Sequence, residues 1–261
     1  TKFVYNWNMR ELSNVFQGLC QARPDYYPNT LKVSRLWVHE CRRVFGDRLV
    51  TEDNIVQFDQ ILREHAKLSL NEEPFDQEQL HEEPLVFTSF VAQPSSGEPS
   101  YLPVPAGEDG GEKLAKALRD KLAEYNQSNS IMDLVLFDQA VQHVCRICRI
   151  IQNPSGNAML VGVGGSGKQS LSRLAAFICG YEVRQLQVTS SFSLFDLFEA
   201  LKDMYKAAGV KGQGVVFLLT DTQIVDEKFL VSVNDILSSG WISDLYPRDE
   251  LDNLFGSLRS E

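Results

Sequence analysis

Residues 157–171 have the sequence NAMLVGVGGSGKQSL, and this stretch decides the fold. Its apolar beginning, 157–163, predicts a short buried strand, and Lys168 opens a segment with helical spacing that runs to Cys179. Between them, the run that starts at Gly162 matches the phosphate-binding pattern Gly-x4-Gly-Lys. Glycines let successive backbone N–H groups point at a phosphate, the helix start adds partial positive charge, and the lysine reaches the β- and γ-phosphates. The stretch therefore predicts a nucleotide-binding loop.

The predicted nucleotide contacts cover the whole loop and the start of the helix: Gly162, Val163, Gly164, Gly165, Ser166, Gly167, Lys168, Gln169 and Ser170. One of these positions departs from the pattern. The residue after the lysine is normally Ser or Thr, whose hydroxyl binds Mg²⁺, but here it is Gln169, with Ser170 one place later. A shift of one residue turns a helical side chain by about 100°, so Ser170 does not substitute. We expect phosphate binding to be retained and Mg²⁺ to be weakly positioned.

A second nucleotide motif is expected at the end of another apolar strand, 215–220, which Asp221 follows. The full motif has two acids, one for Mg²⁺ and one for the attacking water, but this chain offers one carboxylate. If Asp221 is the metal ligand, Thr222 stands at the base position; if Asp221 is the catalytic acid, Thr220 stands at the metal position. Positioning and charge supply nearly all catalysis of phosphoryl transfer, so the site suits holding nucleotide better than fast turnover. A core strand that ends in a solvated Asp221 is the alternative reading.

Strands and helices alternate after residue 113, which is typical of a parallel sheet covered by helices on both faces, and thus of an α/β fold. The expected helices are 113–125, 133–151, 168–179, 194–208 and 226–237, and the expected strands are 157–163, 182–188 and 215–220. The first seventy residues instead predict a small all-α part, with helices over 8–19, 31–45 and 51–68. Asn8 and Glu11 have the spacing of a capping box at the first of these helices.

The charge of the chain is concentrated between these two parts. The 261 residues carry a formal net charge of −10, and the segment 71–112 contains ten acidic residues, no basic residue and six of the ten prolines. We interpret this segment as a solvated connector, with a short strand over 85–91 and a loop over 93–111. The parts on either side are nearly neutral, so nucleic acid is a poor candidate for a partner.

Other classes of protein and of site are also disfavoured. No apolar run approaches the roughly 18 residues of a membrane span, and the first residues do not resemble a signal peptide, so we expect an intracellular protein without a membrane partner. Five widely spread cysteines predict reduced thiols. Cys145 and Cys148 lack the second pair that a zinc site needs, and the histidines show no metal spacing. Guanine-recognition and transporter motifs are absent from the sequence, which leaves adenine nucleotide.

Longer strings carry a family resemblance. Residues 156–171, together with LVLF at 134–137, HVCRI at 143–147 and TDTQI at 220–224, resemble the fourth AAA+ module of an axonemal dynein heavy chain. Upstream, NMRELSNVFQG at 8–18 and LWVHE at 36–40 resemble the helical lid that closes the third module. The resemblance covers nearly the whole chain except the stretch from about 93 to 111.

The resemblance implies three parts. Residues 1–83 would be the lid of the preceding module, 84–112 a strand and linker, and 113–261 a P-loop AAA+ large subdomain cut off before its sensor 1 and lid. Arg10 would sense the γ-phosphate of the preceding module's nucleotide. Leu134 and Val135 would lie near the adenine. Alignment to the family puts Thr220 at the metal position and Asp221 at the catalytic position. The alternative for Leu134 and Val135 is that they belong to a helix core, and the alternative for Arg10 is that it is an ordinary surface arginine.

The resemblance also implies a function. The chain would be a fragment of a microtubule motor ATPase, with a regulatory site for ATP or ADP, and would be inactive or very slow when isolated. Its partners would be the neighbouring AAA+ modules and dynein accessory chains, and microtubules would be bound only by parts outside it. The expected location is the cytoplasm, the cytoskeleton and the axoneme of cilia or flagella. A degenerate module that binds no nucleotide and has a structural role in the ring is the competing hypothesis.

Overall fold

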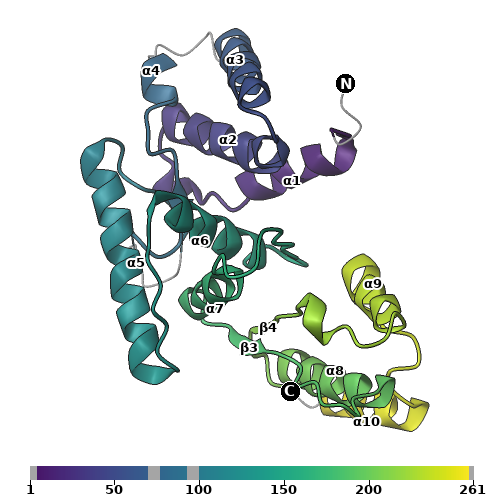
Figure 1. Ribbon diagram of the computed structural model, residues 1–261. Helices are drawn as coiled ribbons and strands as arrows, with labels where there is room; N and C mark the ends of the chain where they lie inside the picture. The colour runs from purple at the N-terminus through teal and green to yellow at the C-terminus, as the bar shows by residue number, and fades with distance from the viewer. Residues whose placement is uncertain (1–4, 70–76, 93–99, 259–261) are drawn as a thin grey trace. The chain divides into compact units, whose positions relative to one another are not determined.

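The computed structural model describes residues 5–69, 77–92 and 100–258 (Figure 1). The chain divides into two compact units, Thr1–Asp120 and Lys121–Glu261, which are described separately. The first unit contains α1 (Met9–Leu19), α2 (Thr30–Val44), α3 (Glu52–Ser69), α4 (Gln77–Leu80), β1 (Phe87–Thr88) and β2 (Leu102–Pro103). Helix α5 (Glu108–Ser128) begins in this unit and ends in the second. The three helices predicted for the first seventy residues are therefore confirmed.

The core of the first unit forms where α1 packs against α2 and where β1 and β2 lie nearby. Val15 of α1 and Leu36 and Val38 of α2 are almost completely buried. The rings of Phe87 and Tyr101 stack with centroids 5.9 Å apart in the same core. Apolar residues of the predicted connector thus belong to the first unit.

The predicted loop over 93–111 is wrong for Leu102–Pro103 and from Glu108 onward, while 100–101 and 104–107 have neither helix nor strand structure and 93–99 lies outside the described residues. Phe87 pairs with Pro103 and Thr88 with Leu102 in a short antiparallel ladder. Helix α5 begins at Glu108, five residues before the predicted start. One glycine of this stretch has a packing role: a Cβ at Gly110 would lie 1.7 Å from the carbonyl oxygen of Pro105.

The second unit is an α/β arrangement in which β3 (Glu182–Arg184) and β4 (Val215–Phe217) form a parallel pair. Val183 pairs with Val216 in this ladder. Helix α7 (Lys168–Ile178) contacts β3 and α6 (Asp138–Ile151), while α8 (Leu194–Gly209) contacts β4 (Figure 1). A 3₁₀ turn over Asp221–Gln223, α9 (Phe229–Ser239) and α10 (Arg248–Leu258) follow. The parallel pairing and the helix order agree with the predicted fold, although both strands are shorter than expected and α10 was not predicted.

Two predicted elements next to the loop are not formed as expected. The segment 157–163 has no strand structure, and Met159 and Val161 expose 90% and 84% of their surface. An extended segment becomes a strand only when its N–H and C=O groups pair with a neighbour, and among the described residues none pairs with it. Helix α6 begins at Asp138, so Leu134 and Val135 lie in an irregular segment rather than at a helix start.

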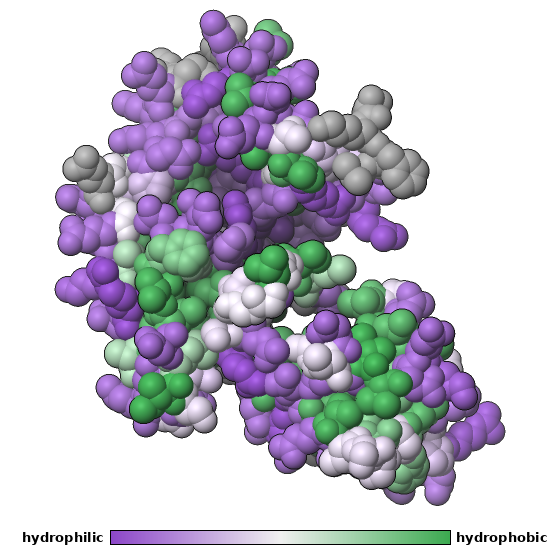
Figure 2. All heavy atoms as spheres, in the orientation of Figure 1, coloured by the Kyte–Doolittle hydropathy of each residue, from purple (hydrophilic) through white to green (hydrophobic). Residues whose placement is uncertain are grey.

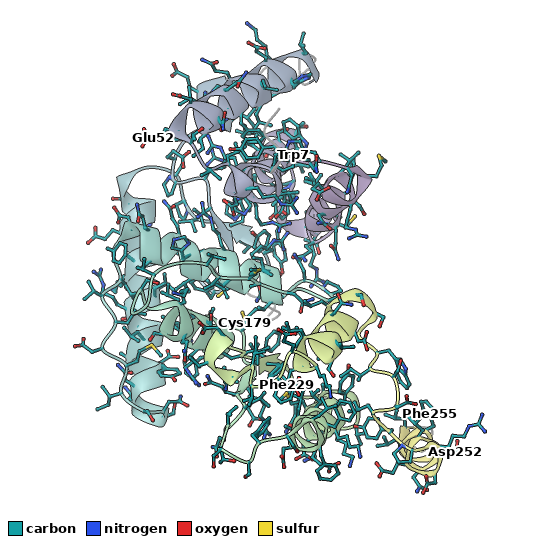
Figure 3. All side chains as sticks on the ribbon, turned by 45° about the vertical axis from the view of Figure 1, so that its right-hand side comes forward. Trp7, Glu52, Cys179, Phe229, Asp252 and Phe255 are labelled. Carbon is teal, nitrogen blue, oxygen red and sulfur yellow. The ribbon has the colours of Figure 1, made fainter. Side chains whose placement is uncertain are left out.

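One hydrophobic core of the second unit lies around α8 and α9, and α6 and α7 bury apolar side chains against each other as well. Leu197 and Leu201 of α8 and Phe229 of α9 are almost fully buried, and Phe229 is labelled in Figure 3. The solvent side of α9 is mixed: Leu230 and Val231 are exposed along with Asn234 and Ser238, and Figure 2 shows hydrophobic and hydrophilic residues together in this part of the second unit. Within the described part of the chain, no helix is both long enough and apolar enough to span a membrane.

Candidate nucleotide-binding site

The glycine-rich loop has the backbone conformation that its sequence predicts. Gly165 and Gly167 have φ angles of +75° and +76°, in the left-handed region that side chains with a Cβ rarely adopt. Gly167 is the N-cap of α7 and supplies no side chain to the first turn, so no side-chain hydrogen bond caps this helix end. The first N–H groups of a helix have no intrahelical partner. The start of α7 is therefore able to bind an anion through its backbone.

Lys168 folds its side chain back over the loop. Its ammonium group donates to the carbonyl oxygens of Gly162 and Val163, at 2.9 and 2.7 Å, and to Oγ of Ser166, at 3.1 Å. The positive charge is thus held directly at the loop, where it attracts a phosphate. Movement of the ammonium group to a phosphate would exchange these neutral acceptors for a charged one, which makes a stronger hydrogen bond.

The space around the loop is open where a ligand would approach. A Cβ at Gly164 or Gly165 would meet no heavy atom within 4 Å. Leu134 does lie beside the loop, because its Cδ1 is 3.7 Å from the place that a Cβ would occupy if Gly167 had a side chain. Val135, the other predicted adenine neighbour, exposes 76% of its surface. The first of these two apolar residues is therefore placed against the end of the loop, and the second projects into solvent.

The helix positions after the lysine bear on metal binding. Gln169 is exposed and Ser170 is half-buried. Ser172, one turn further, uses its hydroxyl on the carbonyl oxygen of Lys168 at 2.9 Å. The position that would supply a hydroxyl to Mg²⁺ therefore presents an amide side chain to solvent.

The end of β4 carries the second group of predicted residues. Asp221 begins the 3₁₀ turn, and its carboxylate is exposed. Thr220 directs its hydroxyl to Oε1 of Gln223 at 3.1 Å and lies 3.0 Å from the hydroxyl of Thr222. Because an amide oxygen only accepts, the proton of Thr220 points to Gln223, and the hydroxyl of Thr222 donates to Thr220. The three side chains form a directed chain of hydrogen bonds next to Asp221.

Gln223 is a residue of this site that sequence reasoning missed. Its side chain is buried, with 6% exposed, and its Nε2 donates to the carbonyl oxygen of Leu186 at 2.5 Å. Its Oε1 also accepts from the backbone N–H of Thr220 at 2.9 Å. A glutamine three residues after a threonine matches the capping-box spacing, which was the available signal for this role.

Arg10 lies in the first unit, in the first turn of α1. The predicted capping box is present: Asn8 accepts from the N–H of Arg10 at 2.8 Å, and Glu11 accepts from the N–H of Asn8 at 2.9 Å. This last bond, with the pairing of Glu11 to Arg48 at 2.8 Å, lowers the pKa of the Glu11 carboxyl. Arg10 itself is exposed. Its helix turn is held firmly, which leaves its guanidinium directed outward.

The remaining candidate groups have structural surroundings. All five cysteines are free thiols, and burial raises the pKa of Cys145 to about 12. His39 bonds to the carbonyl oxygen of Leu85 at 3.1 Å and to the hydroxyl of Tyr101 at 2.8 Å. Across residues 5–69, 77–92 and 100–258, no group of three His, Cys, Asp or Glu side chains is arranged to hold a metal ion.

Comparison with known proteins agrees with this geometry. The family model described as "P-loop containing dynein motor region D4" matches residues 132–261, and the AAA+ lid domain model matches residues 1–78. The chain is 47% identical over 264 residues to the dynein beta chain of the flagellar outer arm of Chlamydomonas reinhardtii. It is 45% identical over 260 residues to the ciliary dynein beta chain of Tripneustes gratilla and 42% identical over 262 residues to dynein axonemal heavy chain 9 of Homo sapiens.

The parallel strands, the phosphate-binding loop and the helical lid define a P-loop AAA+ region joined to an AAA+ lid, and this class binds nucleotides. The matches extend over the full length of the chain at more than 40% identity. The chain belongs to the axonemal dynein heavy chain family. It spans 6% of the length of each of these relatives, so it corresponds to one segment of such a protein.

Proposed function

We propose that this chain is the segment of a dynein motor that joins the lid of the third AAA+ module to the nucleotide-binding subdomain of the fourth. Residues 1–83 serve as the lid, 84–112 connect, and 113–261 carry the site. The observation that carries the proposal is the ammonium group of Lys168, held over the loop at the open start of α7. The family membership and the separate matches of the lid and P-loop models support the division.

The ligand of this site is ADP or ATP, and its role is mainly regulatory. The loop, with Lys168, Gln169 and Ser170, holds the phosphates, and Leu134 and Val135 lie toward the adenine. Mg²⁺ is weakly positioned, since Gln169 brings no hydroxyl and Asp221 is the one carboxylate in the motif. In the motor, Asp221 acts on the water that attacks ATP, and Arg10 senses the γ-phosphate in the preceding module.

The partners follow from the family. The two parts contact neighbouring AAA+ modules of the same heavy chain, accessory chains bind elsewhere, and microtubules are bound by segments outside these residues. The relatives are named for flagella, cilia and axonemes, so we place the protein in the axonemal cytoskeleton. The isolated chain hydrolyses ATP slowly or not at all, because Gln169 brings no hydroxyl to Mg²⁺ and Asp221 is the one carboxylate of the second motif.

The test is nucleotide binding in the full-length heavy chain, followed by hydrogen exchange of the peptide 157–171. This readout reports on one loop even where other modules also bind nucleotide. We expect ADP and ATP to slow exchange in this peptide, and Lys168→Ala to abolish the effect. Lys211→Ala, an exposed lysine in the same unit, is the matched control and should behave as the wild type. Exchange that neither nucleotide changes in the wild-type protein would exclude a nucleotide site.

The role of Mg²⁺ and the role of Asp221 in hydrolysis are tested separately. Removal of Mg²⁺ should change the ADP concentration for half-protection by less than about tenfold, and Gln169→Thr should increase that dependence. Asp221→Asn should lower the phosphate release that this site contributes, and equal release would remove Asp221 from the mechanism.

The alternative is a degenerate module whose role is packing within the ring. Two observations favour it: the segment 157–163 is exposed rather than paired in a sheet, and Lys168 already has three acceptors in its own loop. This function predicts that neither ADP nor ATP protects the loop, while truncation of the exposed apolar side chain of Val161 weakens contacts between modules.

A further inference from the structure

The backbone hydrogen bonds between β3 and β4 are regularly spaced, and this regular spacing ends near the candidate site. The N–H of Glu182 donates to the carbonyl oxygen of Gly214 at 2.8 Å, and the N–H of Leu218 donates to that of Arg184 at 2.9 Å. In a parallel ladder the next bond of this kind lies two residues further along both strands. It would join the N–H of Thr220 to the carbonyl oxygen of Leu186.

The side-chain amide of Gln223 takes the place of that bond. The N–H of Thr220 donates to Oε1 of Gln223 at 2.9 Å, and Nε2 of Gln223 donates to the carbonyl oxygen of Leu186 at 2.5 Å. One amide therefore stands between the donor and the acceptor of the next rung and satisfies both. Its orientation is fixed, because the N–H of Thr220 can only donate and the carbonyl of Leu186 can only accept.

This inserted amide separates the two strand ends and closes a short ring of chain around Asp221. Gln223 is the last residue of the 3₁₀ turn that Asp221 begins, and its side chain returns to Thr220, the residue before Asp221. The ring is anchored to the neighbouring strand through Leu186, and this anchor is buried, since Gln223 exposes 6% and Leu186 also 6% of its surface, whereas Asp221 and Thr222 are exposed. A change in the backbone direction of this turn at Asp221 would have to break or strain these bonds.

We propose that Gln223 is the positioning residue of this site: its amide, inserted between the carboxyl ends of β3 and β4, sets where Thr220 and Asp221 stand. Ligands of parallel sheets bind at these strand ends, so the residue that sets their spacing governs how Asp221 meets a nucleotide. Gln223 needs no contact with the nucleotide for this role. The part of the inference that concerns Asp221 rests on the proposed function, whereas the inserted amide itself does not.

The first experiment needs no nucleotide. Hydrogen exchange of the peptide 216–225 is measured in the full-length heavy chain for the wild type, Gln223→Met and Gln223→Glu. Met has a similar length but no amide, so we expect exchange at Thr220 and the turn to be at least about tenfold faster, because a buried donor and acceptor lose their partners. Glu keeps an acceptor for Thr220 but faces the carbonyl of Leu186 with a carboxylate, so the Leu186 end should open first. Gln213→Met, at an exposed position of the same unit, is the matched control. Unchanged exchange in Gln223→Met would overturn the inference whatever the nucleotide does.

The second experiment asks whether Gln223 acts through Asp221. ADP and ATP are titrated onto the wild type, Gln223→Met, Asp221→Asn and the double variant, and protection of the loop peptide 157–171 is followed. We expect Gln223→Met to change the ADP concentration for half-protection of the loop peptide by less than about threefold. The same substitution should remove the part of the difference between ATP and ADP protection that Asp221→Asn also removes. In the Asp221→Asn background it should then have little further effect, a non-additivity that marks coupled residues. Additive losses for both nucleotides would mean that Gln223 only stabilises the fold. Absence of protection in the wild type would instead refute the proposed function, and the first experiment would still decide the role of Gln223.

Discussion

Two adjacent loop glycines allow the conformation of the candidate site to be tested by one methyl group. Gly165 has a φ of +75°, whereas Gly164 has no positive φ, and a Cβ at either position would meet no heavy atom within 4 Å. Alanine at Gly165 therefore acts through backbone strain alone, which amounts to about 1–2 kcal/mol for an L-residue in the left-handed region. Alanine at Gly164 introduces neither strain nor a clash.

The strain lowers the affinity if the observed loop is the conformation that binds phosphate and the free loop of the variant relaxes away from it. A factor of ten in affinity corresponds to about 1.4 kcal/mol, so Gly165→Ala should weaken ADP binding by roughly 5- to 30-fold. Gly164→Ala should stay within about twofold of the wild type. Asparagine tolerates the left-handed region better than alanine, so Gly165→Asn should fall between them.

The assay is an ADP titration of the full-length heavy chain, read as hydrogen exchange in the peptide 157–171, which isolates this loop from other nucleotide sites. Thermal unfolding of each variant shows whether the fold is intact. An equal loss at Gly164 and Gly165, or wild-type affinity for Gly165→Ala, would mean that the bound loop differs from the one described here.

Three further predictions concern the rest of the chain. Gly110→Ala should destabilise the first unit by about 1–3 kcal/mol in urea unfolding, because its Cβ would lie 1.7 Å from a backbone oxygen. Gly111→Ala has open space around it and should be neutral or stabilising, so equal effects of the two substitutions would contradict the packing of α5. Burial lowers the pKa of His81 to about 4, so the folded state prefers the neutral ring. The free energy of unfolding should therefore fall as the pH drops from about 6.5 towards 4, by at most about 1.4 kcal/mol per pH unit, and His81→Phe should flatten that slope. A thiol reagent at neutral pH should label exposed Cys20 rapidly and Cys145 only after unfolding, since burial raises the pKa of Cys145 to about 12; fast labelling of both would show that α6 opens readily.

Local patterns predicted local structure well. The capping box of Asn8 and Glu11 and the left-handed glycines before α7 depend on residues within one turn of one another. Such features are readable because the interacting groups lie three or four positions apart in the sequence. Helices α1, α2 and α3 and the glycine-rich loop before α7 were therefore predictable as elements.

Features that depend on distant partners were predicted less well. The segment 157–163 has the composition of a buried strand, but a strand also needs a neighbour, and its residues are exposed in this structure. Gly110 and Gly111 were placed at the end of the predicted loop over 93–111, although Gly110 is required by a close backbone contact with Pro105. Gln223 bonds to Leu186, 37 positions earlier, and no spacing rule connects them.

The geometry of the strand end also bears on the two registers that the sequence left open for Asp221. Thr220 has already directed its proton to Gln223 and accepts from Thr222, so it offers a metal a neutral oxygen that is largely engaged. Gln169 likewise brings no hydroxyl at the start of α7. Under the proposed function, both protein contributions to a Mg²⁺ shell would therefore be weakened together, and the phosphates would depend on backbone N–H groups and Lys168. The backbone N–H groups and Lys168 can hold the phosphates of both ADP and ATP, although Lys168 can reach a γ-phosphate only in ATP, so we expect Asp221, in a turn closed by the amide of Gln223, to add to the distinction between the two nucleotides.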